Sequence, residues 1–143
     1  LSNPKKLIGD LDDAMKGRDV FIGVSGPHIV TETMVRSMAK DPIVFALANP
    51  EPEIARDLAK KAGARMIATG RSDYPNQINN VLAYPGVFKG VLESGAPQIT
   101  DEMKLAAARA LAEYVTDPKE DALLPNPLDK EVARVVADAV KAV

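Results

Sequence analysis

Short continuous runs of apolar residues alternate with helical patterns in the first half of the chain. The apolar runs cover residues 20–24, 43–48 and 65–69, and glycine, proline or polar residues bound each of them. A continuous run of this length is typical of a strand that is buried on both faces of a parallel sheet. We therefore predict that each run is such a strand.

Apolar residues at helical spacing precede and separate these runs. Residues 7–15 predict a first helix, for which Asn3 and Pro4 form a suitable start. Thr31 is placed to cap a second helix, and residues 52–62 predict a third. Strands that are joined through single helices pair in parallel with right-handed crossovers, so this half predicts a βαβαβ arrangement.

Only helical patterns follow residue 75. Short helical pieces broken at Pro85 come first, and Thr100 and Asp129 are placed to cap two longer helices. The last helix carries one continuous apolar stripe, which indicates packing in a core or an interface rather than a cofactor site. That stripe consists of Val132, Val135, Val136, Ala139, Val140 and Val143.

The complete pattern predicts one α/β domain over residues 1–143, with a βαβαβ part at 1–75 and a helical part at 76–143. We expect a partial Rossmann-like parallel sheet of three strands, with flanking helices and a C-terminal helical segment. A Rossmann-type sheet normally has about six strands, so an edge that is usually paired is left open. Open edges recruit other chains, and we expect self-association through this edge or through the valine stripe.

Composition and charge narrow the classes of partner. The chain has 143 residues, of which 46% are hydrophobic and 27% are charged, and its net charge is -2. This balance argues against nucleic acid as a partner. No apolar run approaches the ~20 residues of a membrane span, so we expect no membrane insertion. The start of the chain has no signal peptide pattern, and we expect the cytoplasm as its location.

The inventory of residue types excludes two kinds of site. The chain has no cysteine, which excludes disulfides and thiolate metal sites. His28 is the single histidine, which excludes a histidine-rich metal site. A solvated face explains the carboxylates on the predicted first helix better than a metal site does, and the helix dipole explains those at the start of the third helix. These carboxylates are Asp10, Asp12, Asp13, Glu51, Glu53 and Asp57.

A ligand crevice is predicted where the three strands end. Ligands of open parallel sheets bind at the carboxyl ends of the strands, and the residues there include Gly23-Val24-Ser25, Asn49 and Gly70. Glycine lets a ligand approach the backbone, and the side chains of Ser25, Asn49 and Ser72 offer hydrogen bonds without charge. The same residue types are ordinary in turns, so the pattern predicts a crevice without naming its ligand.

Two further features bear on that crevice. No G-x-G-x-x-G occurs, so the usual pyrophosphate-binding turn is missing. Residues 76–80 contain four amides, of which Asn76 is best interpreted as a helix N-cap. Asn79 and Asn80 fall inside the predicted helix, where asparagine is a poor helix former. Breaking this local rule without a structural gain indicates a functional role for these two amides.

Long stretches of the chain resemble the malic enzyme family in its bacterial form. TGRSDYPNQINNVLAYPGVFKGVLE, at residues 69–93, resembles the family almost position for position. DVFIGVSGP, at residues 19–27, and DPIVFALANPEPEI, at 41–54, look like the two preceding strands of the same domain. ITDEMKLAAARALA, at residues 99–112, also fits the family. The resemblance covers essentially the whole chain and indicates the C-terminal part of the NAD-binding domain.

The resemblance implies an activity and its requirements. Malic enzymes oxidise L-malate with NAD or NADP and decarboxylate it to pyruvate and CO2, and they use a divalent metal, Mg or Mn. The resemblance places Asn49, Asn79 and Asn80 at the substrate, with Asn80 favoured for its carboxylate, and Gly23, Val24, Ser25 and Asn49 along the cofactor.

The resemblance also implies that the catalytic groups lie elsewhere. The family's tyrosine and lysine acid–base pair, its metal-binding carboxylates and its glycine-rich diphosphate turn precede this segment, and Tyr74, Tyr84 and Tyr114 do not match the catalytic tyrosine. We therefore expect no catalytic residue or metal ligand on this chain and no activity from the chain alone. The partners that the resemblance implies are the missing N-terminal part of the enzyme and, in a homo-oligomer, further copies of the same enzyme. A standalone non-catalytic nucleotide-binding module and a purely structural fragment are the alternatives.

Overall fold

The structure is a computed structural model that describes Asn3 and residues 6–143. It divides into two compact units, one up to Pro75 and one from Asn76 onward. The first unit contains, in order, α1 (Leu11–Met15), β1 (Val20–Gly23), α2 (Glu32–Ser37), β2 (Ile43–Ala46), α3 (Arg56–Lys61) and β3 (Met66–Thr69). The second unit contains the 3-10 helix η1 (Asn80–Leu82), α4 (Tyr84–Ser94), α5 (Asp101–Tyr114) and α6 (Lys130–Lys141).

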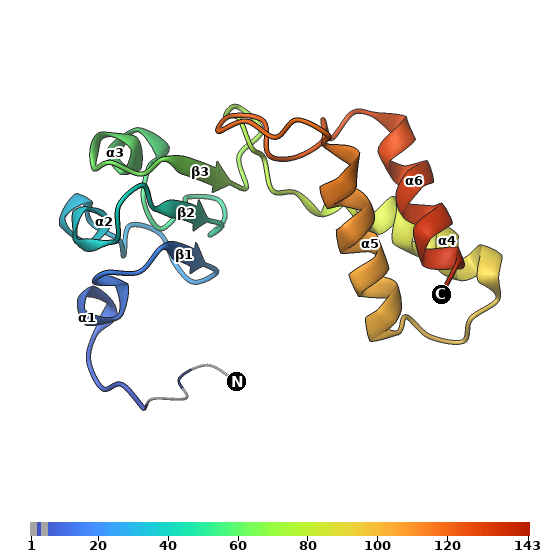
Figure 1. Cartoon of the computed structure of the whole chain (residues 1–143), viewed down its shortest axis with the longest axis horizontal. Coiled ribbons are helices and arrows are strands. Elements are labelled where there is room, and N and C mark those ends of the chain that lie inside the picture. Colours follow the sequence, from blue (N-terminus) through green and yellow to red (C-terminus); the bar gives the residue numbers. More distant parts are fainter. Residues whose placement is uncertain (1–2, 4–5) are drawn as a thin grey trace. The chain divides into compact units, whose positions relative to one another are not determined.

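Parallel strands form the sheet of the first unit, in the order β1-β2-β3 (Figure 1). Gly23, Ala46 and Thr69 lie side by side in this register, so the strands end at the same edge of the sheet. One helix separates each strand from the next. The α/β class, the three-stranded parallel sheet and the helical C-terminal segment that the sequence predicted are confirmed.

Helices α1, α2 and α3 cover one face of this sheet, and Figure 1 shows them in a row beside the strands. Because side chains alternate between the two faces of a strand, every second strand residue joins this layer. Phe21, Val44 and Ile67 therefore share the helix-covered face. The core comprises Met15, Val30, Val35, Met38, Val44, Ala46, Ile54, Ala59, Ala62, Ala64 and Ile67.

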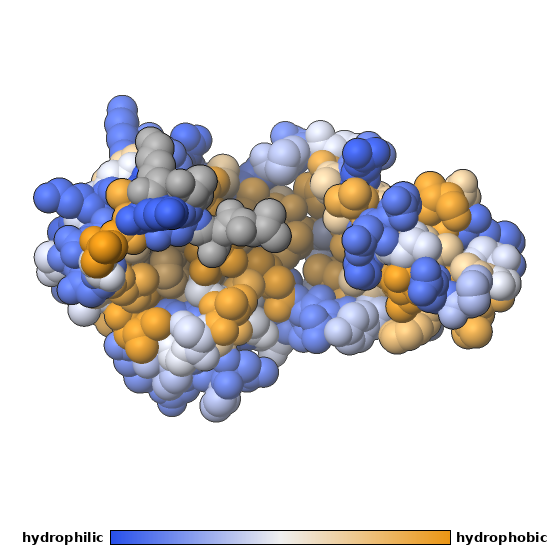
Figure 2. Space-filling view, turned by 90° about the horizontal axis from the view of Figure 1, so that it is seen from below, coloured by the Kyte–Doolittle hydropathy of each residue, from blue (hydrophilic) through white to orange (hydrophobic). Residues whose placement is uncertain are grey.

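The opposite face of the sheet is largely open, which corrects the prediction that the strands are buried on both faces. Val20 and Ile22 of β1 are 46% and 62% exposed, and Ile43, Phe45 and Met66 are half-buried. Figure 2 looks from the side on which β1 lies in Figure 1, and apolar side chains gather there on the first unit. The apolar runs therefore belong to a sheet that the described residues cover on one face.

The first helix begins later than the sequence pattern predicted. The Asp10 carboxylate accepts a hydrogen bond from the N–H of Asp13, and the Asp13 carboxylate accepts one from the N–H of Asp10. This reciprocal capping box satisfies N–H groups at the helix start, so the helix begins at Leu11. Asn3 lies outside the helix, and Pro4 lies outside the described residues.

The predicted caps of three other helices are confirmed. Side-chain oxygens of Thr31, Thr100 and Asp129 accept hydrogen bonds from backbone N–H groups at the starts of α2, α5 and α6. Pro85 lies in the first turn of α4 rather than at a break, because its missing N–H removes no helical hydrogen bond there. Within Asn3 and residues 6–143, no helix has the length and apolarity that crossing a membrane requires.

The second unit has a core of its own between α4, α5 and α6. Val136 and Val140 are fully buried, so the valine stripe serves as core, as predicted. Val143, the last residue of the stripe, is 60% exposed, and self-association through the stripe stays a prediction. The core comprises Leu82, Val87, Met103, Ala107, Val132, Val136 and Val140.

Candidate functional site

The carboxyl ends of the three strands form the candidate site in the first unit. Gly23, Ala46 and Thr69 pair in register at this edge, and the strand arrows of Figure 1 all point to it. The chain leaves the edge through loops at residues 24–31 and 47–55 and through the segment 70–75. Ligands of open parallel sheets bind at this kind of edge.

A buried carboxylate links the loops that follow β1 and β2. Glu53 is 0% exposed. Its Oε1 accepts hydrogen bonds from the N–H of Ser25 (2.9 Å) and, at greater length, from the Ser25 hydroxyl (3.4 Å). Its Oε2 accepts a hydrogen bond from the N–H of Ala48 (3.0 Å). Both loops are thus tied to one side chain.

The sequence pattern placed Glu53 among the carboxylates that favour a helix start, and that interpretation is wrong. Helix α3 begins at Arg56, with Ala55 as an N-cap that makes no side-chain cap bond, so Glu53 lies outside the helix. Gly23 was the usable signal in the sequence, because glycine within an apolar strand indicates that another group approaches the backbone closely. A Cβ at Gly23 would lie 2.5 Å from Cδ of Glu53.

Glu53 is ionised at neutral pH in this site. Burial raises the pKa of its carboxyl group, whereas hydrogen bonds from the N–H groups of Ser25, Ala48 and Glu53 itself lower that pKa. Together the hydrogen bonds outweigh burial, so the pKa lies below its ordinary value. A buried carboxylate keeps its charge where donors satisfy its oxygens. The folded loops therefore include a fixed negative charge.

Residues next to these anchored positions are open to solvent. Val24 is 80% exposed, and Ser25 and Asn49 are exposed as well. A Cβ at Gly26 would meet open space, so the edge is accessible there. The peptide bond between Asn49 and Pro50 is cis. The structure thus brings the cofactor-lining residues that the resemblance implied onto two neighbouring strand ends.

The segment after β3 carries charged and aromatic side chains. Arg71 donates two hydrogen bonds to the Asp73 carboxylate, of 2.9 and 2.7 Å, which raise the pKa of Arg71 and lower the pKa of Asp73. The guanidinium carbons of Arg56 and Arg71 lie 5.8 and 5.5 Å from the centroid of the Tyr74 ring. A cavity of about 180 Å³ beside them is lined by His28, Glu51, Pro52, Ala55, Arg56, Arg71 and Tyr74.

The amide-rich segment belongs to the second unit, and its members have different roles. Asn76 is not the N-cap that the pattern predicted: it is buried, donates to the carbonyl of Glu120 (2.7 Å) and accepts from the N–H of Leu123 (2.8 Å). Asn79 caps η1 by accepting from the N–H of Val81 (3.0 Å), so it lies at the helix start rather than inside it. Asn80 is the first residue of η1 and is exposed.

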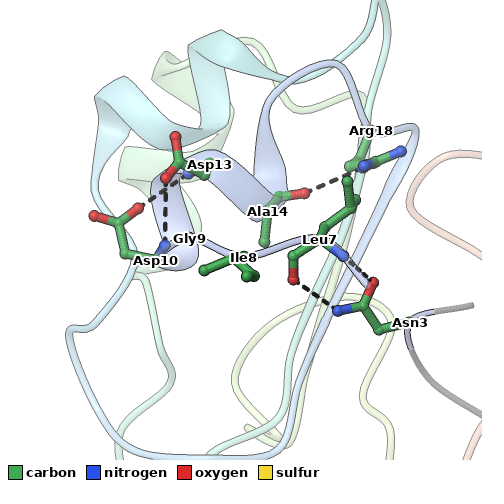
Figure 3. A pocket seen from close by; sticks show the side chains of 8 residues that line it. All are labelled: Asn3, Leu7, Ile8, Gly9, Asp10, Asp13, Ala14 and Arg18. Atoms are coloured by element: carbon green, nitrogen blue, oxygen red, sulfur yellow. Dashed lines mark hydrogen bonds between the residues drawn. The ribbon is translucent and has the colours of Figure 1, made fainter. Parts of the chain in front are cut away.

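A second cavity in the first unit, of about 510 Å³, lies against α1 (Figure 3). Its polar groups already bond to one another: Asp10 and Asp13 form the capping box, and Arg18 donates to the carbonyl of Ala14. The amide of Asn3 bonds to the backbone of Leu7 on the same wall. Throughout the described part of the chain, no group of three or more histidine, aspartate or glutamate side chains is placed to hold a metal ion.

Residues 10–143 match the family model described as "Malic enzyme, NAD binding domain". The bifunctional malic/malolactic enzyme of Bacillus subtilis is 51% identical over 141 residues, which are 97% of this chain and 34% of that protein. The NAD-dependent malic enzyme of Geobacillus stearothermophilus is 52% identical over 98% of this chain and 30% of its own length. The NADP-dependent malic enzyme of Escherichia coli is 44% identical over 91% of this chain and 19% of its own length.

Solved structures agree with these sequence matches. The malic enzyme from Pyrococcus horikoshii superposes with a TM-score of 0.92 and 47% identity, over 98% of this chain and 33% of that one. The malic enzyme of Entamoeba histolytica gives a TM-score of 0.93 and 42% identity, over 98% of this chain and 29% of that one. The chain thus spans about a third or less of the length of the relatives that it matches.

Proposed function

Because the chain belongs to the family of malic enzyme NAD-binding domains, we propose that it forms the part of a malic enzyme that holds the nicotinamide side of NAD or NADP and orients L-malate. The carrying observation is the strand-end edge, where Glu53 ties together two loops whose neighbouring residues Val24 and Asn49 are exposed. The complete enzyme then converts L-malate to pyruvate and CO2.

The residues at this edge fit the nicotinamide half of a dinucleotide. When bound, NAD or NADP accepts a hydride from malate. Val24 offers an apolar surface, and the Ser25 hydroxyl and the Asn49 amide offer uncharged hydrogen bonds to a ribose or a carboxamide. The absence of G-x-G-x-x-G assigns the diphosphate to residues other than these.

The remaining parts of the reaction require groups from outside residues 1–143. The described residues offer no ligand set for a divalent metal, so no residue here is assigned to Mg or Mn. We expect the acid–base pair to lie in another part of the complete enzyme, and Asn79 and Asn80 to contact malate. The isolated chain should therefore show no turnover of malate with either cofactor and either metal.

The proposal is tested in the full-length malic enzyme that contains residues 1–143. Asn49→Ala should lower kcat/KM about two-fold to ten-fold, because a neutral hydrogen bond contributes roughly 0.5–1.5 kcal/mol. Asn126→Ala is the matched control, since Asn126 is also an exposed amide and lies far from Asn49 in the sequence. Its side chain accepts a hydrogen bond from the N–H of Leu128. A wild-type enzyme without malate-dependent reduction of NAD or NADP would refute the proposal.

A further inference from the structure

Glu53 is a charged side chain that is completely buried in a loop. Its exposed fraction is 0%, whereas Glu51, in the same loop, is exposed. Charged residues are almost never fully buried unless their charge is satisfied by partners. Burial at this position therefore depends on the hydrogen bonds that the surrounding loops donate.

The backbone around Glu53 is fixed to the loop that follows β1. The N–H of His28 donates to the carbonyl of Pro52 (3.2 Å), and the N–H of Val30 donates to the carbonyl of Glu53 (3.0 Å). The side chain then accepts from Ser25 in the same loop and from Ala48 after β2. Because both the backbone and the carboxylate are bonded, the side chain is held at its two ends.

Gly23 provides the space that the carboxylate occupies. A Cβ at residue 23 would lie 2.5 Å from Cδ and 2.6 Å from Oε1 of Glu53. Carbon atoms that are not bonded to each other prefer about 3.5–4.0 Å, so the two groups cannot share this volume. Cε1 of Phe21 would be 2.8 Å away as well, so the Glu53 carboxylate and the Phe21 ring together explain the glycine at 23.

The two anchored N–H groups lie beside the exposed residues of the candidate site. Val24 directly precedes Ser25, and Asn49 directly follows Ala48. Each exposed side chain is therefore one peptide unit away from a hydrogen bond to Glu53. A shift of the carboxylate would shift both of them.

We infer that Glu53 is a positioning residue of the cofactor site, whose carboxylate fills the space above Gly23 and sets the spacing of the loops that carry Val24, Ser25 and Asn49. The inference rests on the proposed function, which assigns those loops to NAD or NADP. Glu53 itself is enclosed by protein and acts through the loops, without contacting the cofactor.

The decisive variant is Glu53→Gln in the full-length enzyme. Glutamine keeps the shape of the side chain but replaces one carboxylate oxygen with an NH2 group, which accepts no hydrogen bond. The side chain can then no longer accept from the N–H groups of both Ser25 and Ala48. The dissociation constant for NAD or NADP should rise about ten-fold or more, because a hydrogen bond to a charged group is lost. Turnover at saturating cofactor should change by less than about three-fold, since the reacting groups are untouched.

Glu113→Gln is the control, because it removes the same charge from an exposed residue of α5 outside the candidate site. Its cofactor affinity should equal that of the wild type. Glu53→Asp keeps the charge but is one methylene shorter, so it gives a second variant if Glu53→Gln fails to fold, and its affinity should also fall. A lower Tm with unchanged cofactor affinity in either folded variant would overturn the inference and leave Glu53 a structural residue.

The relationship with Gly23 has a separate test that needs no cofactor. Gly23→Ala should lower Tm strongly in the wild-type background, because its methyl group meets Glu53. In a Glu53→Ala background the same change should lower Tm less, because the carboxylate is gone; equal shifts in both backgrounds would overturn the steric relationship. A wild-type enzyme that binds neither cofactor would instead refute the proposed function, and this outcome is distinguishable from the other two.

Discussion

Gly86 of α4 and Val136 of α6 lie so close together that a Cβ at residue 86 would come within 2.6 Å of the Cβ of Val136. The backbone carbonyl oxygen of Ala133 would be 2.8 Å away. At Gly90, the carbonyl oxygen of Ala137 would be 2.6 Å away. A backbone oxygen cannot move aside as a flexible side chain can. These two glycines therefore set how closely α4 and α6 pack.

Gly86→Ala and Gly90→Ala should each destabilise the second unit by about 1–3 kcal/mol, the usual cost of overpacking a core. The sign is informative, because alanine in a helix otherwise gains about 1 kcal/mol over glycine. Urea unfolding of the chain measures the change. Lys89→Ala, at an exposed position of the same helix, is the control and should change stability by less than about 0.5 kcal/mol. Stabilisation by either glycine variant would contradict the packing described above.

The hydroxyl of Tyr114, at the end of α5, donates to the carboxylate of Asp129, the N-cap of α6, at 2.6 Å. The hydrogen bond from Tyr114 is the main cause that lowers the pKa of Asp129, and the one from the N–H of Glu131 is the second. The bond between Tyr114 and Asp129 also raises the pKa of Tyr114. Tyr114→Phe should therefore move the pKa of Asp129 back toward its ordinary value. An NMR titration of the carboxyl group measures it.

The contribution of this pair to the free energy of unfolding should fall at both acidic and alkaline pH. The folded pKa of Asp129 is lowered, so its contribution is complete above the ordinary pKa and is lost as pH falls through the folded value. The folded pKa of Tyr114 is raised, so its contribution is lost as pH rises through that value. Tyr84→Phe is the control. An equal effect of both variants on Asp129 would count against the contact.

Asn80→Ala in the full-length enzyme should impair the use of malate far more than cofactor binding. A neutral donor to a charged carboxylate contributes roughly 1.5–3 kcal/mol, so kcat/KM for malate should fall about ten-fold to a hundred-fold. Folding should change little, because Asn80 is exposed at the start of η1 and alanine is the better helix former. Steady-state kinetics, cofactor affinity and Tm are measured on the same variant.

Asn76→Ala is the matched contrast, because Asn76 is a buried amide that bonds to the backbone at Glu120 and Leu123. It should lower Tm and leave the kinetics of the folded fraction unchanged, since each buried partner that loses its bond costs about 1–3 kcal/mol. If Asn80→Ala gave this same pattern, Asn80 would have a structural role and would be removed from the site.

The isolated chain should self-associate through the open face and edge at β1. Val20 and Ile22 are exposed there, and an exposed strand edge pairs with other chains. Ile22→Lys should shift the chain toward monomer, because a buried ammonium group at the contact would be strongly unfavourable. Sedimentation velocity at several concentrations measures the association. Leu105→Lys, at an exposed apolar residue of α5, should have no effect, and a clean wild-type monomer at high concentration would refute the prediction.

Local sequence patterns located the three strands of this chain and the caps of three helices. Apolar runs located the three strands to within about two residues. Thr31, Thr100 and Asp129 were identified as caps because a cap bonds to N–H groups only two or three residues away. The resemblance over residues 69–93 indicated the malic enzyme family, which the match of residues 10–143 to the family model confirms.

Long-range contacts were decided only by the tertiary structure. Glu53 resembled a helix-start carboxylate, and its burial depends on Ser25, 28 residues away. Asn76 resembled an N-cap, but its partners lie 44 and 47 residues further along the chain. The role of Gly86 is set by Val136 and Ala133 of α6, which pack against it. A sequence pattern reports a residue's neighbours along the chain, whereas the roles of these residues are set by groups that only folding brings near.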